Sequence, residues 1–150
     1  MGESPRSSRL GPDFLVDNDL SPLIAKALQA FGFNVQTVEQ ALGSRDVKDE
    51  QIIPWLGSTQ TVWITHDKKA KSRHAISLKA NRVSLLCVRG DKLSSWDQFK
   101  IVVRVFDVLC EKVRKRRGAI HCRASLKSGP TPTVYWTERP EDRPRQHKRR

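Results

Sequence analysis

The stretch from residue 13 to residue 38 decides the fold, and it reads DFLVDNDLSPLIAKALQAFGFNVQTV. Its first five residues, DFLVD, form a short apolar run that predicts a buried strand. Ser21 and Pro22 then begin a helix, with serine as the N-cap and proline at the first helical position. Apolar residues recur at helical spacing until Gly32 ends the helix, and residues 33–38 predict a second strand. This order of strand, helix and strand favours an α/β domain.

The same alternation continues downstream. Residues 47–56 predict a helix that contains Pro54, a residue expected to kink or end it. Residues 61–65 and 83–88 predict two more strands, with a basic helix over 68–79 between them. The run VSLLCV at 83–88 is continuously apolar, as in a parallel sheet that is buried on both faces. With a long helix over 94–117 and one more strand within 119–126, we expect a three-layer α/β/α domain around a mainly parallel sheet of four to five strands.

The helix over 94–117 carries the clearest amphipathic pattern. A stripe of apolar residues recurs at intervals of three and four, and it consists of Trp96, Phe99, Val103, Phe106, Cys110 and Val113. Charged residues occupy the opposite face. We expect this stripe to pack on the sheet of the same chain.

Charge divides the 150 residues unequally. The whole chain has a formal net charge of +12, and residues 112–150 alone hold 13 lysines and arginines against three acids. We therefore expect a leader over 1–12, a domain over 13–126 and a basic, largely disordered tail over 127–150. A basic segment on a nearly neutral body favours a polyanionic partner, most often nucleic acid. A solvated tail that aids solubility is the alternative.

Composition excludes several classes of protein. No apolar run approaches the roughly 20 residues of a membrane helix, and residues 1–13 lack the apolar centre of a signal peptide. The three cysteines form no C-x-x-C pair, which argues against a disulfide framework and a cysteine zinc site. We expect a cytoplasmic protein with no membrane partner.

Acidic residues stand where the predicted strands end. Asp17 and Asp19 follow the first strand, Asp67 follows the third, and Asp49 and Glu50 begin the helix between them. In a parallel sheet these positions gather at one edge, where ligands bind. Neighbouring carboxylates repel one another, and a hard cation such as Mg²⁺ or Mn²⁺ removes that repulsion and can activate water against a phosphodiester. The alternative is that each acid only caps a helix or favours its dipole.

A basic segment follows the third acid. Lys68, Lys69, Lys71 and Arg73 have no acid among them and are candidates for binding a phosphate backbone. His66 is a candidate for contact with a phosphate or a base, or is only a polar residue at a strand end. We expect His74, in the same segment, to face solvent.

Three motifs in order carry a family resemblance. D-x-x-L-S-P starts at Asp17, D-E-Q-I-I-P-W starts at Asp49, and V-W-I-T-H-D-K-K spans 62–69. Together they resemble the PIN-like domain toxins, the VapC-type ribonucleases of bacterial toxin–antitoxin pairs, over about residues 13–126. The chain departs from many of these relatives in having Asp19 where they have asparagine and Lys69 where they have a further acid.

The resemblance implies an α/β/α domain that cuts single-stranded RNA with three or four acids and Mg²⁺ or Mn²⁺. Asp17, Asp49 and Asp67 match the catalytic, metal-binding acids, with Glu50 beside Asp49 as an assistant or substitute. Thr65 matches the small polar residue before the last acid. The resemblance also implies an RNA substrate, a cognate antitoxin protein and a possible homodimer.

Three functions compete at this stage. The leading hypothesis is a metal-dependent endoribonuclease that serves as a toxin. The second is a phosphatase of the haloacid-dehalogenase type, in which Asp17 would be the nucleophile and Asp19 the general acid of a D-x-D-x-S motif. This phosphatase leaves Asp49 and Asp67 without a task. The third is a relative that binds RNA without cutting it.

Overall fold

The computed structural model describes residues 10–115 and 118–136. These residues are built on one sheet with the strand order β2-β1-β3-β4-β5-β6. Strands β1 to β5 run parallel, and β6 pairs antiparallel with β5. The strands are β1 (Leu10–Val16), β2 (Phe33–Thr37), β3 (Val62–Thr65), β4 (Leu85–Val88), β5 (His121–Ala124) and β6 (Thr133–Trp136). The predicted mainly parallel sheet is confirmed, but it has six strands instead of four to five.

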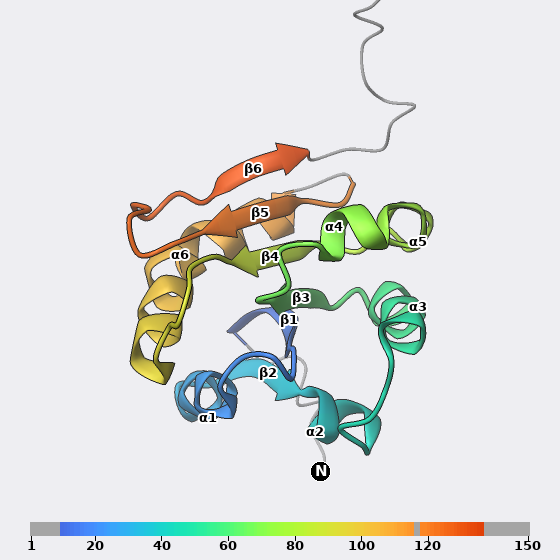
Figure 1. Cartoon of the computed structure of the whole chain (residues 1–150), viewed down its shortest axis with the longest axis horizontal. Coiled ribbons are helices and arrows are strands. Elements are labelled where there is room, and N and C mark those ends of the chain that lie inside the picture. Colours follow the sequence, from blue (N-terminus) through green and yellow to red (C-terminus); the bar gives the residue numbers. More distant parts are fainter. Residues whose placement is uncertain (1–9, 116–117, 137–150) are drawn as a thin grey trace, which may run out of the picture.

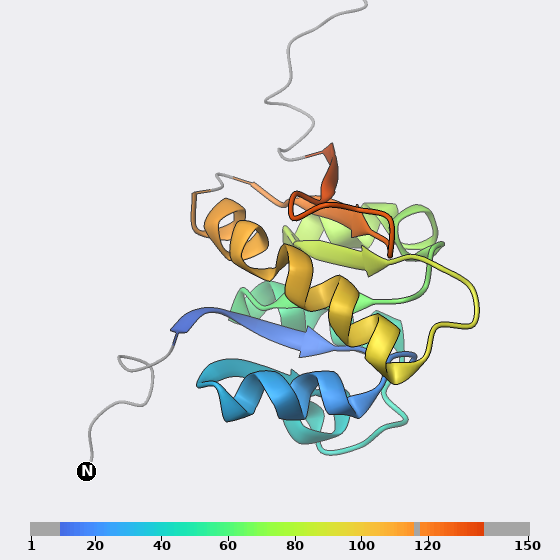
Figure 2. The same ribbon diagram turned by 90° about the vertical axis from the view of Figure 1, so that its left-hand side faces the viewer.

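Helices cover both faces of this sheet, which confirms the expected three-layer α/β/α fold (Figures 1 and 2). One face carries α1 (Pro22–Ala30) and α6 (Ser95–Lys115). The other carries α2 (Val38–Leu42), α3 (Asp49–Thr59), α4 (Ala70–Arg73) and α5 (Ala75–Asn81). Among these described helices, none is long and apolar enough to cross a bilayer.

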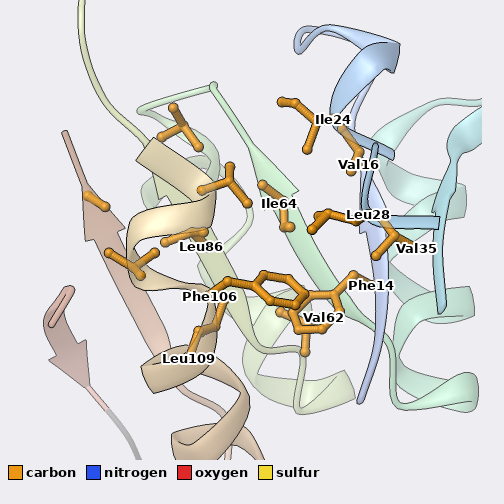
Figure 3. Close-up of a cluster of buried hydrophobic side chains, with 14 of the residues drawn as sticks. Phe14, Val16, Ile24, Leu28, Val35, Val62, Ile64, Leu86, Phe106 and Leu109 are labelled. Atoms are coloured by element: carbon orange, nitrogen blue, oxygen red, sulfur yellow. The ribbon is translucent and has the colours of Figure 1, made fainter. Parts of the chain in front are cut away.

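Alternating side chains of the strands build a core on each side of the sheet. Phe14 and Val16 of β1 pack with α1 and α6, whereas Leu15 between them packs on the opposite side with α3. Figure 3 shows the first core, in which Phe106 of α6 lies against Phe14 with ring centroids 4.9 Å apart. Because side chains of a strand alternate between faces, a strand buried on both sides is apolar throughout.

Strand structure extends beyond both predicted limits of the domain, residues 13 and 126. At the first limit, β1 starts at Leu10, and its register with β2 shifts between Leu10 and Phe14. This irregularity accommodates the Gly11-Pro12 pair that suggested a leader. At the second limit, residues 133–136 form β6 within the predicted tail. Residues 1–9 and 137–150 of the predicted leader and tail lie outside the described residues.

The predicted stripe of α6 is partly wrong. Trp96 and Val103 are 63% and 46% exposed, whereas the buried face consists of Ile101, Val102, Val105, Phe106, Leu109, Cys110 and Val113. The side of α6 that faces the sheet is therefore the one that holds Val102 and Val105. Two other segments also differ from expectation: α3 continues past Pro54 to Thr59, and the basic helix over 68–79 is broken at His74 into α4 and α5.

The strand order places a topological switch next to β1. The chain passes from β1 to β2 on one side and then returns to β3 on the other side of β1. In open α/β sheets the connections diverge at such a point and leave a crevice outside the carboxyl ends of the two strands. The ends of β1 and β3 lie there, followed at once by Asp17 and His66.

Candidate functional site

Two aspartates at the end of β1 share the hydroxyl of Thr65 at the end of β3. Thr65 is buried, and its Oγ1 lies 2.8 Å from Asp17 Oδ2 and 3.3 Å from Asp19 Oδ2. The hydroxyl has one hydrogen, so it can donate to only one of the two carboxylates at a time. Asp19 does not cap α1, because Ser21 accepts the capping bond from Leu23 N. The capping alternative for Asp19 is therefore wrong.

The position of this pair changes its acidity. The pKa of Asp17 is raised from 3.8 to about 6, chiefly by burial and next by the charge of Asp19. Hydrogen bonds from Thr65 and Asn18 lower it, while the nearby charge of Asp49 adds a small increase. Burial also raises the pKa of Asp19, while hydrogen bonds from the backbone N–H of His66 and from Thr65 lower it. The hydrogen bonds that the two carboxylates accept come from backbone N–H groups and the Thr65 hydroxyl, and the nearby charge of His66 also lowers the pKa of Asp19.

Asp67, the third predicted acid, has partners at both carboxylate oxygens. The backbone N–H of Lys69 donates to its Oδ1 at 2.9 Å, and Arg73 Nη1 lies 3.0 Å from its Oδ2. Its own backbone N–H donates to Thr65 Oγ1 at 3.1 Å. This last bond joins Asp67 to the Asp17–Asp19 pair through one shared hydroxyl.

The acids of α3 take different positions. Asp49 Oδ2 lies 3.1 Å from His74 Nε2, at the break between α4 and α5. The side chain of His74 is only 10% exposed, so the expectation that it faces solvent is wrong. Glu50 is exposed, and neither a hydrogen bond nor an ion pair joins it to another residue in the described part of the chain. The structure therefore brings Asp49 near the pair at β1 but leaves Glu50 outside.

The donor set fits a hard cation in part. Oxygen ligands are what Mg²⁺ and Mn²⁺ prefer, and the Asp17–Asp19 pair supplies two carboxylates. Within residues 10–115 and 118–136, however, no group of three or more His, Cys, Asp and Glu side chains is arranged to hold a metal ion. Arg73 and His74 engage the two remaining acids, Asp67 and Asp49.

Two pockets meet beside Asp67 and Lys68. The larger has a volume of about 680 Å³ and is also lined by Asp19 and His66. The smaller has a volume of about 280 Å³ and is also lined by Lys71. The ring Nδ1 of His66 lies 2.7 Å from Val88 O, which fixes the orientation of the ring.

The predicted substrate-binding residues separate into two groups. His66, Lys68 and Lys71 line these pockets, so they are placed to meet a ligand. Thr65 is buried among the acids, and Arg73 lies on Asp67, while Lys69 touches neither pocket. Sequence reasoning missed the Asp49–His74 pair, because the two residues lie 25 positions apart and no local pattern links them.

A parallel α/β/α sheet with carboxylates at its switch point defines a class of domain in which ligands bind at that edge. A family model described as a PIN-like domain matches residues 12–88, a range that contains all five predicted acids. The chain belongs to the PIN-like domain family. PIN domains are generally nucleases that use divalent metal ions. No curated protein and no solved structure matches the chain. The match gives no support to the phosphatase hypothesis, because the D-x-D segment lies within the PIN-like region.

Proposed function

We propose that this protein is a metal-dependent endoribonuclease that hydrolyses RNA phosphodiester bonds. The observation that carries the proposal is the Asp17–Asp19 pair on a single hydroxyl at the switch point, with the pKa of Asp17 raised to about 6. Such a pair attracts a divalent cation, because the cation removes the repulsion between the carboxylates. Membership of the PIN-like family supports the same conclusion.

The chain's own residues have distinct roles in this proposal. Asp17 and Asp19 would hold the ion, and Asp67, whose carboxylate now contacts Arg73, would be the third ligand. Asp49 adds negative charge near Asp17. When bound, Mg²⁺ or Mn²⁺ polarises a phosphoryl oxygen and lowers the pKa of water.

Cations of the pocket hold the substrate beside these acids. Lys68 and Lys71 line the two pockets that meet at Asp67, so they can neutralise phosphates on either side of the cleaved bond. His66, anchored on Val88 O, completes the wall next to the acids.

The test compares total RNA incubated with wild type and with an Asp17→Asn preparation made identically. Mg²⁺, Mn²⁺ and EDTA are the three conditions. We expect discrete cuts with either metal in the wild type only. Equal cutting by both preparations would reveal a contaminant and refute the assignment.

A second candidate, RNA binding without cleavage, has a specific observation in its favour. Arg73 forms an ion pair with Asp67, and His74 Nε2 lies 3.1 Å from Asp49 Oδ2, so two of the acids already have partners within the protein. If both preparations bind RNA in EDTA and neither cuts it with Mn²⁺, this second function replaces the first.

The toxin role is a narrower part of the proposal and rests on the resemblance to VapC-type toxins. It places the protein in the cytoplasm with a cognate antitoxin. A homodimer finds support in the exposed apolar side chains of Trp96 and Val103 on α6. Induced expression of the wild type should arrest growth, and expression of Asp17→Asn should not. Size-exclusion chromatography with light scattering should show a dimer, and Trp96→Ser should weaken that dimer.

A further inference from the structure

The larger pocket reaches beyond the acids to a second wall that the proposed function does not use. This far wall comes from the loop that leaves β4 and from the end of β5, and it consists of Arg89, Gly90, Asp91 and Ser125. A volume of about 680 Å³ lies within the roughly 300–1,000 Å³ of pockets that bind small molecules. The space next to the acids therefore accommodates a ligand the size of a nucleotide.

Backbone contacts hold the far wall in place. The backbone N–H of Arg89 donates to Ala124 O at 2.8 Å, which ties the loop after β4 to β5. Gly90 has a φ of 142°, and a Cβ there would lie 2.9 Å from Leu93 Cδ2, so any residue other than glycine would be strained at this turn. Ser125 is fixed by its N–H, which donates to Ser128 Oγ at 2.9 Å. A wall that is ordered before binding loses less conformational entropy when a ligand arrives.

The two charged residues of the wall select different parts of a nucleotide. Arg89 forms no ion pair with any residue in the described ranges, and a guanidinium binds phosphate oxygens through two parallel bonds. Asp91 is exposed, and a carboxylate repels phosphate and accepts hydrogen bonds from amino groups. Where cytosine carries its amino group, N4, uracil carries a carbonyl oxygen, O4. Of these two pyrimidines, only cytosine can therefore donate a hydrogen bond to Asp91 from that position.

We propose that this pocket is a nucleotide-recognition subsite for single-stranded RNA, in which Arg89 binds a phosphate next to the cleaved one and Asp91 selects cytosine over uracil. The inference rests on the proposed function, since RNA bound at the acids is what places a neighbouring nucleotide here. Single strands are the substrate class because an unpaired base can leave the stack and enter a pocket. Ser125 contributes a hydroxyl that can donate or accept beside the base.

Fluorescence anisotropy of labelled oligo(C) and oligo(U) in EDTA tests the subsite without cleavage. The variants are Arg89→Gln and Asp91→Asn. Arg82→Gln is the matched control, because Arg82 is exposed and precedes β4 at the opposite edge of the sheet. Urea midpoints verify that each variant is folded.

We expect wild type to bind oligo(C) about tenfold more tightly than oligo(U). Arg89→Gln should weaken both by about tenfold and reduce the salt slope by about 0.7, the loss of one phosphate contact on a single strand. Asp91→Asn should bind the two oligomers equally, because an amide both donates and accepts. Equal binding of the oligomers by wild type, or an Arg89→Gln variant no weaker than Arg82→Gln, would overturn the subsite.

Failure of the subsite and failure of the proposed function give different results. If the protein does not cleave RNA, binding in EDTA still depends on Arg89 and Asp91, and only the nuclease assignment is lost. If cleavage requires Asp17 but neither wall variant changes binding, the nuclease stands and the subsite is wrong.

Discussion

Replacing Asp17 by asparagine should stabilise the metal-free protein while abolishing the proposed cleavage. Burial and the charge of Asp19 raise the pKa of Asp17 from 3.8 to about 6, so the folded state disfavours the ionised form. Each pKa unit corresponds to about 1.4 kcal/mol, so ionised Asp17 costs the folded protein roughly 3 kcal/mol at pH 7. Asparagine keeps the shape and can still accept from Thr65 Oγ1.

The pH dependence has a definite sign. A group whose folded pKa is raised contributes stability that is present below the unfolded pKa, here 3.8, and lost as the pH rises through about 6. Neutral Asp17 resembles the amide, so the advantage of Asp17→Asn should be roughly 3 kcal/mol at pH 7 and below about 1 kcal/mol at pH 4.

Urea titration in EDTA, followed by tryptophan fluorescence to which the buried Trp63 contributes, measures both free energies of unfolding. Asp46→Asn, which removes an exposed carboxylate outside the acid cluster, is the matched control and should change little. An Asp17→Asn variant that is no more stable than wild type at pH 7 would refute the reasoning.

Three further predictions concern the fold around the site. Burial lowers the pKa of His121 from 6.5 to about 4, so the stability that neutral His121 contributes above pH 6.5 is lost as the pH falls toward 4. This loss amounts to roughly 3 kcal/mol, and His121→Gln should remove most of it in urea titrations at pH 6.5 and pH 4. Phe106→Ala should cost about 3–5 kcal/mol and Trp96→Ala about 1 kcal/mol or less in the same assay, because only the first side chain is buried; equal losses would contradict the observed orientation of α6. Thr65→Val should cost about 1–3 kcal/mol at pH 7 relative to Thr65→Ser, since Asp17 loses its hydroxyl donor, and equal midpoints would contradict that role.

The acids could be located from the sequence because their positions follow from local pattern and one general rule. Apolar runs at β1 and β3 marked where each strand ends, and the parallel sheet brings those ends to one edge. The rule gives the positions of Asp17, Asp19 and Asp67, but not which partner each carboxylate meets.

The orientation of α6 could not be read from its sequence, because the helix contains two overlapping apolar stripes. One passes through Trp96 and Val103, and the other passes through Val102 and Val105. Both satisfy helical spacing, and only contact with β1, β4 and β5 determines which is buried. The edge strand β6 was not predicted for a similar reason. Its pairing with β5 is a tertiary contact, and Pro130 and Pro132 before it favour a loop.

The pairing of acids with cations is the feature that sequence reasoning could least predict, and its energetics bear on the proposed metal site. Arg73 is 53% exposed, and an exposed ion pair such as its contact with Asp67 contributes only about 1 kcal/mol or less. Ionised Asp17 destabilises the folded protein by roughly 3 kcal/mol at pH 7, about three times as much as this ion pair contributes. In the proposed site Asp17 and Asp19 would hold a divalent cation, and release of Arg73 from Asp67 would cost the protein less than ionised Asp17 costs it without the cation. Because the backbone of Asp67 already donates to the same Thr65 hydroxyl, its carboxylate needs only this exchange of partners to join the other two.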